Sequence, residues 1–290
     1  MSKEKRSLPE FDKQTLIMGI LNLTPDSFSG DGLMGNADPL EAALIQARQF
    51  IQGGAHILDI GGESTRPGAQ VVEPEEELTR ILPIIQALNK EFPETLLSVD
   101  TYKAKVAEAA LNAGADWIND VWGLRADPEL VQVVSRHKAP VILMHNRMTP
   151  NSVAVKDRLG GHYVGVQYTD LIADVKTELL ESVNIAIMGG VSKSNIILDP
   201  GIGFGKTVEQ NLKLLNHLNE IGALGFPVLL GVSRKSFIGL TLDLPPDERL
   251  EGSLAANAIG ILRGAAILRV HDVQQTVRLA KMVDAILHTN

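Results

Sequence analysis

Short apolar runs alternate along the chain with longer amphipathic stretches, and a polar or glycine-rich break follows each run. Runs that are apolar at nearly every position are typical of parallel strands, because helices cover both faces of such a sheet. Eight runs fit this description, and they are LIMGILN from Leu16, HILDIGG from His56, LLSVDT from Leu96, WINDVW from Trp117, VILMHN from Val141, IILDPG from Ile196, VLLGVS from Val228 and ILRVHD from Ile267.

The stretches between these runs carry apolar residues at helical spacing. The predicted helices span Pro39–Gly53, Pro74–Glu91, Lys103–Ala113, Asp127–His137, Tyr168–Ile187, Val208–Leu224, Glu248–Arg263 and Val273–Leu287. Eight strand-then-helix units within 290 residues predict an α/β fold, a single (β/α)₈ TIM barrel. We expect residues 1–290 to form this one domain, with residues 1–14 as a polar N-terminal extension.

A doubly wound open sheet is the alternative fold. Its usual GxGxxG signature is missing, because the chain reads NLTPDSFSG from Asn22 onward. Three connections after strands are long: Ser27–Asp38, Ser64–Glu73 and Arg147–Gln167. The third has no clear periodicity, which predicts a long loop that acts as a lid or forms an ordered excursion. All three are expected on the same face of the barrel.

The charge and the cysteine content exclude several classes of function. The formal net charge of −8 and the absence of a Lys/Arg run predict no binding to nucleic acid or to a membrane surface. Zero cysteines exclude disulfides, thiolate metal sites and a cysteine nucleophile. The N-terminus lacks the apolar segment of a signal peptide, and no later stretch is apolar enough to span a membrane, so we expect a cytoplasmic protein.

Polar residues end nearly every predicted strand, and in a barrel these ends carry the chemistry. A single such residue is more often a helix cap or a loop anchor, but a full set favours a site. The set comprises Asn22, Asp59, Glu63, Asp100, Asn119, Asp120, His145, Asp199, Ser233, Arg234, Lys235, Arg269 and His271. Asp100, Asn119 and Asp199 suit the donor-rich edge of a heterocycle. Arg66, Arg269, His271 and Asn22 suit a phosphate group with its metal.

The segment DPGIGFGKT, from Asp199 to Thr207, resembles a nucleotide P-loop only superficially. The GxxxxGKT register requires a glycine at the position of Pro200. The segment is therefore expected to be a tight, glycine-dependent turn that places Phe204 and Lys206 over the barrel mouth, although Phe204 could instead belong to the core.

Eight motifs, one per strand end, carry a resemblance to a known family. They are NLTPDSFSGDG, DIGGESTRPGA, SVDT, INDV, LMH, LDPGIGFGKT, GVSRKSFIG and RVHD, in this order over essentially the whole chain. The chain resembles dihydropteroate synthases, which are (β/α)₈ barrels and usually homodimers. The resemblance implies condensation of 6-hydroxymethyl-7,8-dihydropterin pyrophosphate with 4-aminobenzoate in folate biosynthesis, giving 7,8-dihydropteroate and pyrophosphate. It also implies that sulfonamides compete with 4-aminobenzoate.

The resemblance assigns the site residues to three groups. The pterin would contact Asp100, Asn119, Val121, Met144, Asp199 and Lys235, among which Asp100, Asp199 and Lys235 would be catalytic. The pyrophosphate would bind Asn22, Arg66, Arg269 and His271, with Mg²⁺ shared between Asn22 and phosphate oxygens. The 4-aminobenzoate would contact Phe28, Thr65, Pro67, Phe204, Lys235 and Ser236, with its carboxylate towards Ser236 and a helix N-terminus.

Three other functions remain open at this stage. A pterin-binding methyltransferase domain shares this kind of barrel but is not expected to carry ESTRPGA or SRKSFIG. A Schiff-base aldolase could use Lys235 as its nucleophile. A non-catalytic pterin-binding protein is disfavoured because the motifs for both substrates are complete. One departure from the family pattern is the first loop, which reads SFSGDG instead of SFSDGG, so the acidic residue that acts there is open.

Overall fold

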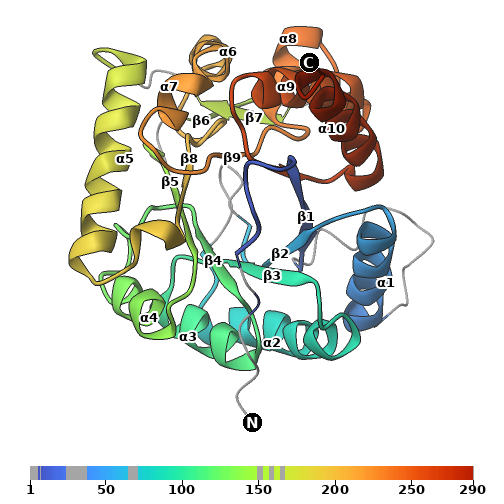
Figure 1. The fold of residues 1–290 in the computed structure, drawn as a ribbon, viewed down its shortest axis with the longest axis vertical. Coiled ribbons are helices and arrows are strands. Elements are labelled where there is room, and N and C mark those ends of the chain that lie inside the picture. The colour runs from blue at the N-terminus through green and yellow to red at the C-terminus, as the bar shows by residue number, and fades with distance from the viewer. Residues whose placement is uncertain are drawn as a thin grey trace.

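Eight parallel strands form a closed barrel surrounded by helices (Figure 1). The computed structural model describes residues 6, 8–23, 38–64, 71–148, 153–156, 160–163 and 167–289. The barrel strands are β1 (Leu16–Asn22), β2 (Ile57–Gly61), β3 (Leu96–Asp100), β4 (Trp117–Asp120), β5 (Val141–Met144), β8 (Ile196–Asp199), β9 (Leu229–Leu230) and β10 (Ile267–Val270).

The hydrogen-bonded order of the strands is β8-β5-β4-β3-β2-β1-β10-β9. Val228, directly before β9, pairs in parallel with Leu198 of β8, and the Leu198 amide donates to the Pro227 carbonyl at 2.9 Å. These contacts join the two ends of the sheet into a ring. The predicted (β/α)₈ barrel is therefore confirmed, and the open-sheet alternative is wrong.

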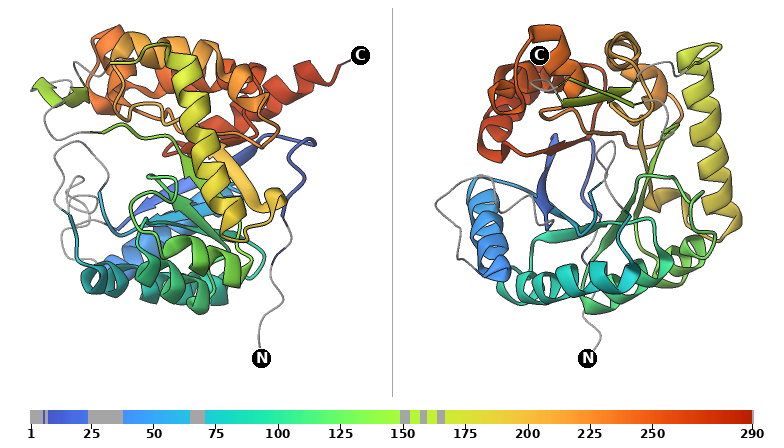
Figure 2. Two further views of the ribbon diagram at one scale, coloured as in Figure 1. Left: turned by 90° about the vertical axis from the view of Figure 1, so that its left-hand side faces the viewer. Right: turned by 180° about the vertical axis from the view of Figure 1, so that it is seen from behind.

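Helices alternate with the strands and lie outside the ring in all three views (Figures 1 and 2). Their bounds are α1 (Pro39–Gln52), α2 (Pro74–Glu91), α3 (Ala104–Ala113), α4 (Leu130–His137), α5 (Leu171–Met188), α6 (Val208–Asn216), α7 (Leu218–Gly222), α8 (Ser236–Leu242), α9 (Leu250–Leu262) and α10 (Val273–Leu287). Among the described residues, none of these helices is long and apolar enough to cross a membrane.

Burial on both strand faces creates two apolar cores. The larger core lies between the strands and the helices. The smaller core fills the inside of the barrel, and it consists of Leu16, Met18, Ile57, Leu96, Trp117, Ile142, Ile197, Leu229 and Ile267. Leu8 and Phe11 pack against this inner core, and the Phe11 ring centroid lies 6.4 Å from that of Trp117. The described part of the N-terminal extension thus closes the floor of the barrel and leaves the opposite end for chemistry.

Two differences from the predicted elements concern loops near the barrel mouth. Residues 147–167, predicted as a loop, contain an antiparallel pair, β6 (Val153–Lys156) with β7 (Gly160–Tyr163). Figure 2, left, shows this hairpin on the side of the barrel opposite the C-terminus. The short helix α8 follows the SRK motif and was not predicted, because seven residues are too few for a periodic signal.

A third difference divides one predicted helix in two. The helix expected over Val208–Leu224 stops at Asn216 and restarts at Leu218, because the intervening His217 leaves helical geometry at φ −107°. The first half begins with a capping box, in which the Thr207 hydroxyl accepts from the Gln210 amide and the Gln210 side chain accepts from the Thr207 amide. This cap fixes the C-terminal boundary of the glycine-rich segment that precedes it.

Candidate active site

The polar strand ends converge at the end of the barrel opposite the N-terminal floor. Parallel register places them at matching heights: Asn119 pairs with Asp100, Gly61 with Asp100, and Met144 with Asp199. Because side chains alternate along a strand, matched positions project together into the barrel. The sequence predicted that Asp100, Asn119 and Asp199 lie at one end of the barrel, and the register adds which of them lie side by side.

A shared guanidinium organises the centre of the site. Arg269 of β10 donates through Nε to Asp59 Oδ2 at 2.6 Å and through Nη2 to Asp100 Oδ2 at 2.7 Å. Asn119 of β4 donates from Nδ2 to the same Asp59 oxygen at 3.0 Å. Asp59 is completely buried and therefore requires these partners. One network thus fixes side chains from four strands, β2, β3, β4 and β10.

Two glycines mark where further site residues come close together. A Cβ on Gly61 would lie 3.7 Å from Asn22 Oδ1 and 3.6 Å from the Asp100 Cβ, so Asn22 and Asp100 flank the same backbone position. A Cβ on Gly231 would lie 3.9 Å from Lys235 Nζ and 4.0 Å from the Arg269 Cβ. The structure therefore brings Asn22, Asp100, Lys235 and Arg269 to one mouth, as predicted.

Burial shifts the protonation equilibria of three site residues. Burial raises the pKa of Asp100 to about 7, although the Arg269 guanidinium acts in the opposite direction. The pKa of Asp199 is also raised by burial, against the lowering effects of Lys235, of the Gly201 amide and of Arg269 and Lys206. Burial lowers the pKa of Lys235 to about 8, against the carboxylates of Asp199 and Asp100. Site charges therefore change near neutral pH.

The glycine-rich turn after β8 brings Asp199, Phe204 and Lys235 together. Asp199 Oδ1 accepts from the Gly201 amide at 2.7 Å, and Lys235 Nζ donates to the Ile202 carbonyl. The same Nζ lies 4.5 Å from the centroid of the half-buried Phe204 ring. Phe204 is therefore a wall of the mouth and not a core residue.

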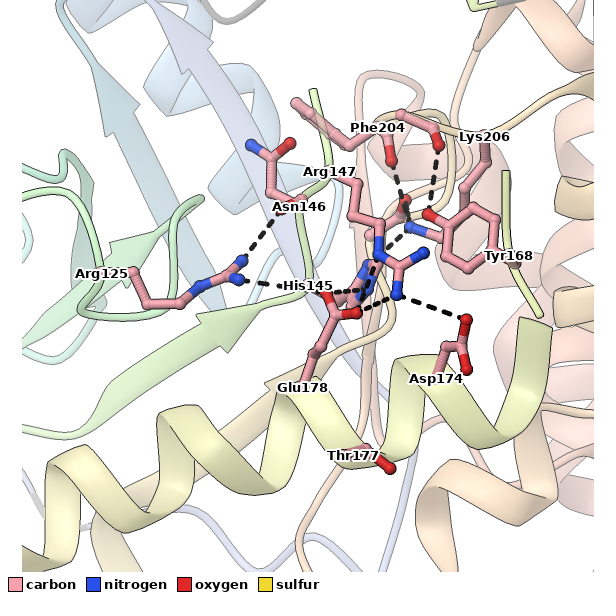
Figure 3. A network of polar contacts seen from close by, with 12 residues as sticks. Arg125, His145, Asn146, Arg147, Tyr168, Asp174, Thr177, Glu178, Phe204 and Lys206 are labelled. Atoms are coloured by element: carbon pink, nitrogen blue, oxygen red, sulfur yellow. Dashed lines mark hydrogen bonds and ion pairs between the residues drawn. The ribbon is translucent and has the colours of Figure 1, made fainter. Parts of the chain in front are cut away.

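The predicted position of Lys206 over the mouth is wrong. Its side chain is only 2% exposed, and Nζ donates into the protein to the Gly201 and Phe204 carbonyls at 2.9 and 3.1 Å. A P-loop lysine must reach a phosphate, whereas this amino group points towards His145 and the carbonyl groups of its own turn (Figure 3). The structure thus agrees that the segment is not a P-loop. The sequence argument rested on Pro200, whereas the structural reason is that Lys206 is buried.

The remaining predicted residues fall into two sets. His271 follows β10, and its Nδ1 lies 3.1 Å from the Ser233 hydroxyl, while Ser236 begins α8. Val121 and Met144 are buried at the ends of β4 and β5. Phe28, Thr65, Arg66 and Pro67 lie outside the described residues.

Sequence reasoning gave no site role to Asp59, although it identified Asp59 as a strand-end residue. The signal was a carboxylate two residues before Gly61 within an otherwise apolar strand. Asp120 illustrates the opposite case, because its carboxylate accepts from the Trp122 and Leu124 amides at 2.8 and 2.6 Å. Asp120 therefore anchors a loop, the ordinary role of a polar strand-end residue.

Comparison with known proteins identifies the family. The family model described as "Pterin binding enzyme" matches residues 18–271. A dihydropteroate synthase from Bacillus subtilis is 50% identical over 284 residues, which cover 98% of this chain and 93% of that protein. The chain belongs to the dihydropteroate synthase family. This membership confirms the predicted activity, a transferase reaction that makes dihydropteroate in folate biosynthesis.

Solved structures of dihydropteroate synthases agree with this membership. A Xanthomonas albilineans enzyme with 4-aminobenzoic acid has a TM-score of 0.86 and 42% identity, covering 97% of this chain and 95% of that one. The Xanthomonas albilineans enzyme in complex with 7,8-dihydropteroate has a TM-score of 0.83 and 39% identity, covering 97% of each chain. The methyltransferase and aldolase alternatives find no support in these comparisons.

Asp199→Asn tests the buried carboxylate. Its amide oxygen can still accept from the Gly201 amide, but its NH₂ group would face the donor edge of a pterin, so kcat/KM should fall by at least about tenfold. Steady-state kinetics with thermal unfolding as a folding control measure this. A loss below about threefold, or roughly 0.7 kcal/mol, would contradict the assignment.

The pH profile of kcat/KM tests the site charges. Asp100 loses its negative charge below its pKa of about 7, and Lys235 loses its positive charge above its pKa of about 8. Activity should therefore fall on both sides of a narrow optimum between these values. Lys235→Arg should move the alkaline limb to higher pH, because a guanidinium stays protonated. An unchanged alkaline limb in this variant would exclude Lys235 as its origin.

Proposed function

We propose that this mouth condenses 6-hydroxymethyl-7,8-dihydropterin pyrophosphate with 4-aminobenzoate and releases pyrophosphate and 7,8-dihydropteroate. The observation that supports this proposal is the placement of the buried Asp100, Asn119 and Asp199 beside two half-buried cations, Lys235 and Arg269. A pterin has a donor-rich edge that suits the first group, and a pyrophosphate ester suits the second.

In the proposed complex, the pterin lies deepest in the barrel. Asp199 accepts from the pterin amino and ring N–H groups, Asn119 completes the polar edge, and Lys235 donates to a ring heteroatom. Met144 and Val121 supply apolar walls beside these groups. The arrangement discriminates strongly, because a ligand without the matching groups would leave buried polar atoms unpaired.

The pyrophosphate would bind towards Arg269, His271, Asn22 and Arg66. Asn22 provides an amide oxygen next to Asp100, a hard oxygen ligand of the kind that Mg²⁺ prefers. Within the described residues, no group of three His, Asp or Glu side chains could hold a metal by itself. The donor set therefore suits a magnesium ion held mainly by substrate phosphates, and bound Mg²⁺ would neutralise negative charge on the leaving group.

Charge stabilisation explains the chemical step. The bond from the exocyclic carbon to the ester oxygen breaks, and its electron pair leaves with pyrophosphate, assisted by Arg269. The Asp100 carboxylate stabilises the positive charge that spreads over the dihydropterin. The amine of 4-aminobenzoate then attacks the exocyclic carbon and loses a proton to solvent. This nitrogen is nucleophilic without prior deprotonation, so His271 is not required as a base.

The aminobenzoate would lie nearer the surface, between Phe204, Lys235 and Ser236. Lys235 lies beside both substrates in this arrangement, because its Nζ is near the Phe204 ring and is also influenced by Asp199. Phe28, Thr65 and Pro67 complete the proposed pocket on the strength of the family resemblance. The solved Xanthomonas albilineans relative with 4-aminobenzoic acid supports this choice of second substrate.

Assembly and location follow the family expectation. We propose a homodimer, supported by exposed apolar side chains on the adjacent helices α9 and α10. These side chains are Ile259, Leu262, Met282, Ile286 and Leu287. Several exposed apolar side chains on two helices that pack together are the kind of surface that a subunit interface covers. The cytoplasm remains the proposed location, because the substrates belong to intermediary metabolism.

A pyrophosphate-release assay tests the proposed reaction. The purified protein with Mg²⁺, the dihydropterin pyrophosphate and 4-aminobenzoate should release one pyrophosphate per dihydropteroate, and EDTA should stop the release. Asn22→Ala should raise the Mg²⁺ concentration needed for half-maximal rate, because one protein oxygen near the metal is lost. Product formation that is insensitive to EDTA would contradict the magnesium proposal alone. No pyrophosphate release would contradict the reaction.

Inhibition by sulfonamides tests the second pocket. A sulfanilamide places an aniline nitrogen and a polar acceptor at a separation similar to that in 4-aminobenzoate, so inhibition should be competitive with 4-aminobenzoate. A sulfonamide complex has been solved for the Yersinia pestis relative. Ser236→Ala should change the ratio of the two affinities, because the two acidic groups differ in shape. Inhibition that excess 4-aminobenzoate does not relieve would argue against this pocket.

A further inference from the structure

A buried ionic network lies directly beneath the turn that carries Phe204. Figure 3 shows Lys206, His145, Glu178 and Arg147 in a connected group, with Tyr168 beside them. These residues come from the turn, from the end of β5, from α5 and from the segments that flank the β6–β7 hairpin. The proposed reaction assigns none of them a role, although burying such groups costs free energy unless each is paired.

The turn rests on the backbone after β5 with almost no space between them. Gly201 and Gly205 have φ of 69° and 62°, which disfavour other residues. A Cβ on Gly201 would lie 1.8 Å from the His145 carbonyl oxygen, and one on Gly205 would lie 2.5 Å from the Arg147 carbonyl carbon. Only glycine allows this approach, so the position of the turn relative to the barrel depends on the backbone of residues 145–147.

Side-chain donors hold the carbonyl groups of the turn. Lys206 Nζ donates to the Gly201 and Phe204 carbonyls, Lys235 Nζ to the Ile202 carbonyl, and the Tyr168 hydroxyl to the Gly205 carbonyl at 3.1 Å. Lys206 thus ties the first and fourth residues of the turn to one nitrogen. Lys206 adds to two other restraints on the turn, because the Phe204 amide donates to the Gly201 carbonyl at 3.1 Å and the Gly203 amide donates to Asn211 Oδ1 at 2.6 Å.

The third Lys206 partner determines the protonation of the network. Nζ lies 2.9 Å from His145 Nδ1, and the His145 Nε2 lies 3.1 Å from Glu178 Oε2. The pKa of Glu178 is lowered to about 2 by His145 and Arg147, against the effect of burial, so this group is a carboxylate and favours the imidazole proton on Nε2. Nδ1 is then the acceptor for Lys206 Nζ. Burial lowers the pKa of His145 to about 4, which keeps the ring neutral. Arg147 completes the arrangement by donating from Nε to Glu178 Oε1 at 2.8 Å.

The same arrangement favours the charged form of Lys206. In the charged form Lys206 can donate one N–H to each of its three acceptors, whereas a neutral amine could serve only two of them, although the Gly201 carbonyl also accepts from the Phe204 amide at 3.1 Å. Burial lowers the pKa of Lys206, and the carboxylates of Asp199 and Glu178 act in the opposite direction, while Lys235 and Arg147 add to the lowering. The network therefore places one cation beneath the turn and near Asp199.

We infer that Lys206 is a positioning residue for the aminobenzoate pocket: supported by His145 and Glu178, its buried ammonium fixes the 201–205 turn and so sets the position of the Phe204 ring. The inference rests on the proposed role of Phe204 in binding 4-aminobenzoate. Lys206 touches neither substrate in this account. Its effect passes through the two carbonyl groups that it binds, one of which belongs to Phe204 itself.

A double-mutant cycle between Lys206 and Phe204 tests this inference. Lys206→Met keeps an unbranched side chain, one heavy atom shorter, and removes the amino group. It should raise the KM for 4-aminobenzoate by about fivefold or more, because small displacements of positioning groups are costly. The Kd of 6-hydroxymethylpterin, measured by calorimetry, should change by a smaller factor than the aminobenzoate KM, because the turn reaches Asp199 and Lys235 only through Gly201 and Ile202. In a Phe204→Ala background, Lys206→Met should have little further effect on the aminobenzoate KM, because the ring that it positions is absent.

Two controls separate positioning from general destabilisation. Arg6→Met removes a comparable ion pair, that of Arg6 with Asp116 at the barrel floor, and should lower the melting temperature without changing either KM. Tyr168→Phe removes one peripheral hydrogen bond from the same turn and should have a smaller effect than Lys206→Met. If Lys206→Met does not fold, Glu178→Gln should give a smaller rise in the aminobenzoate KM, since it weakens the support of His145.

The outcomes distinguish failure of the inference from failure of the proposed function. An unchanged aminobenzoate KM in Phe204→Ala would overturn the proposed role of Phe204. Suppose that Phe204→Ala raises the aminobenzoate KM and that Lys206→Met raises this KM by the same factor in wild type and in Phe204→Ala. That result would overturn positioning through Phe204. An unchanged aminobenzoate KM in folded Lys206→Met would also overturn it.

Discussion

The shared guanidinium of Arg269 is the interaction on which the rest of the site depends. Asp59 and Asp100 lie on adjacent strands, and two buried carboxylates without a cation between them could not both remain ionised. Arg269 neutralises them from across the barrel, while Asn119 satisfies Asp59 from the other side. Because removing one member of a buried ion pair leaves an uncompensated charge, the four side chains act as one unit.

The need to pair every buried charge also explains why the polar groups gather at one end of the barrel. The barrel interior up to Trp117 is apolar and closed by Leu8 and Phe11, so polar groups are confined to the opposite end. There, every buried charge that we describe has partners from different strands or turns. Asp199 and Lys235 are held by backbone groups of the turn, at Gly201 and Ile202. The turn therefore connects Asp199 and Lys235 to the Phe204 ring at the edge of the mouth.

The fold could be predicted from the sequence because parallel barrel strands have a strong local signature. Each apolar run became a strand, and most of the polar residues that end the strands reached the mouth, whereas His145 after β5 is buried beneath the glycine-rich turn. The hairpin at 153–163 and the short helix α8 escaped prediction, since neither is long enough to show a period. The sequence placed five residues correctly at the mouth, namely Asp100, Asn119, Asp199, Lys235 and Arg269. A position at the end of a strand determines both the level of the residue along the barrel axis and the direction of its side chain.

Lys206 shows where such prediction stops. Lysine is rarely buried, so a lysine in a glycine-rich turn is expected to face solvent or a ligand. Its burial depends on acceptors that are distant in sequence or invisible in it: His145 Nδ1 after β5 and the carbonyl groups of Gly201 and Phe204. Main-chain carbonyls are present at every position and carry no sequence signal. The path of the chain directs the Gly201 and Phe204 carbonyls towards Lys206 Nζ. This path is possible because Gly201, without a Cβ, can approach the His145 backbone. The same motif thus places Phe204 at the wall of the mouth and Lys206 beneath it; the sequence left the position of Phe204 open between mouth and core, and it predicted the wrong position for Lys206.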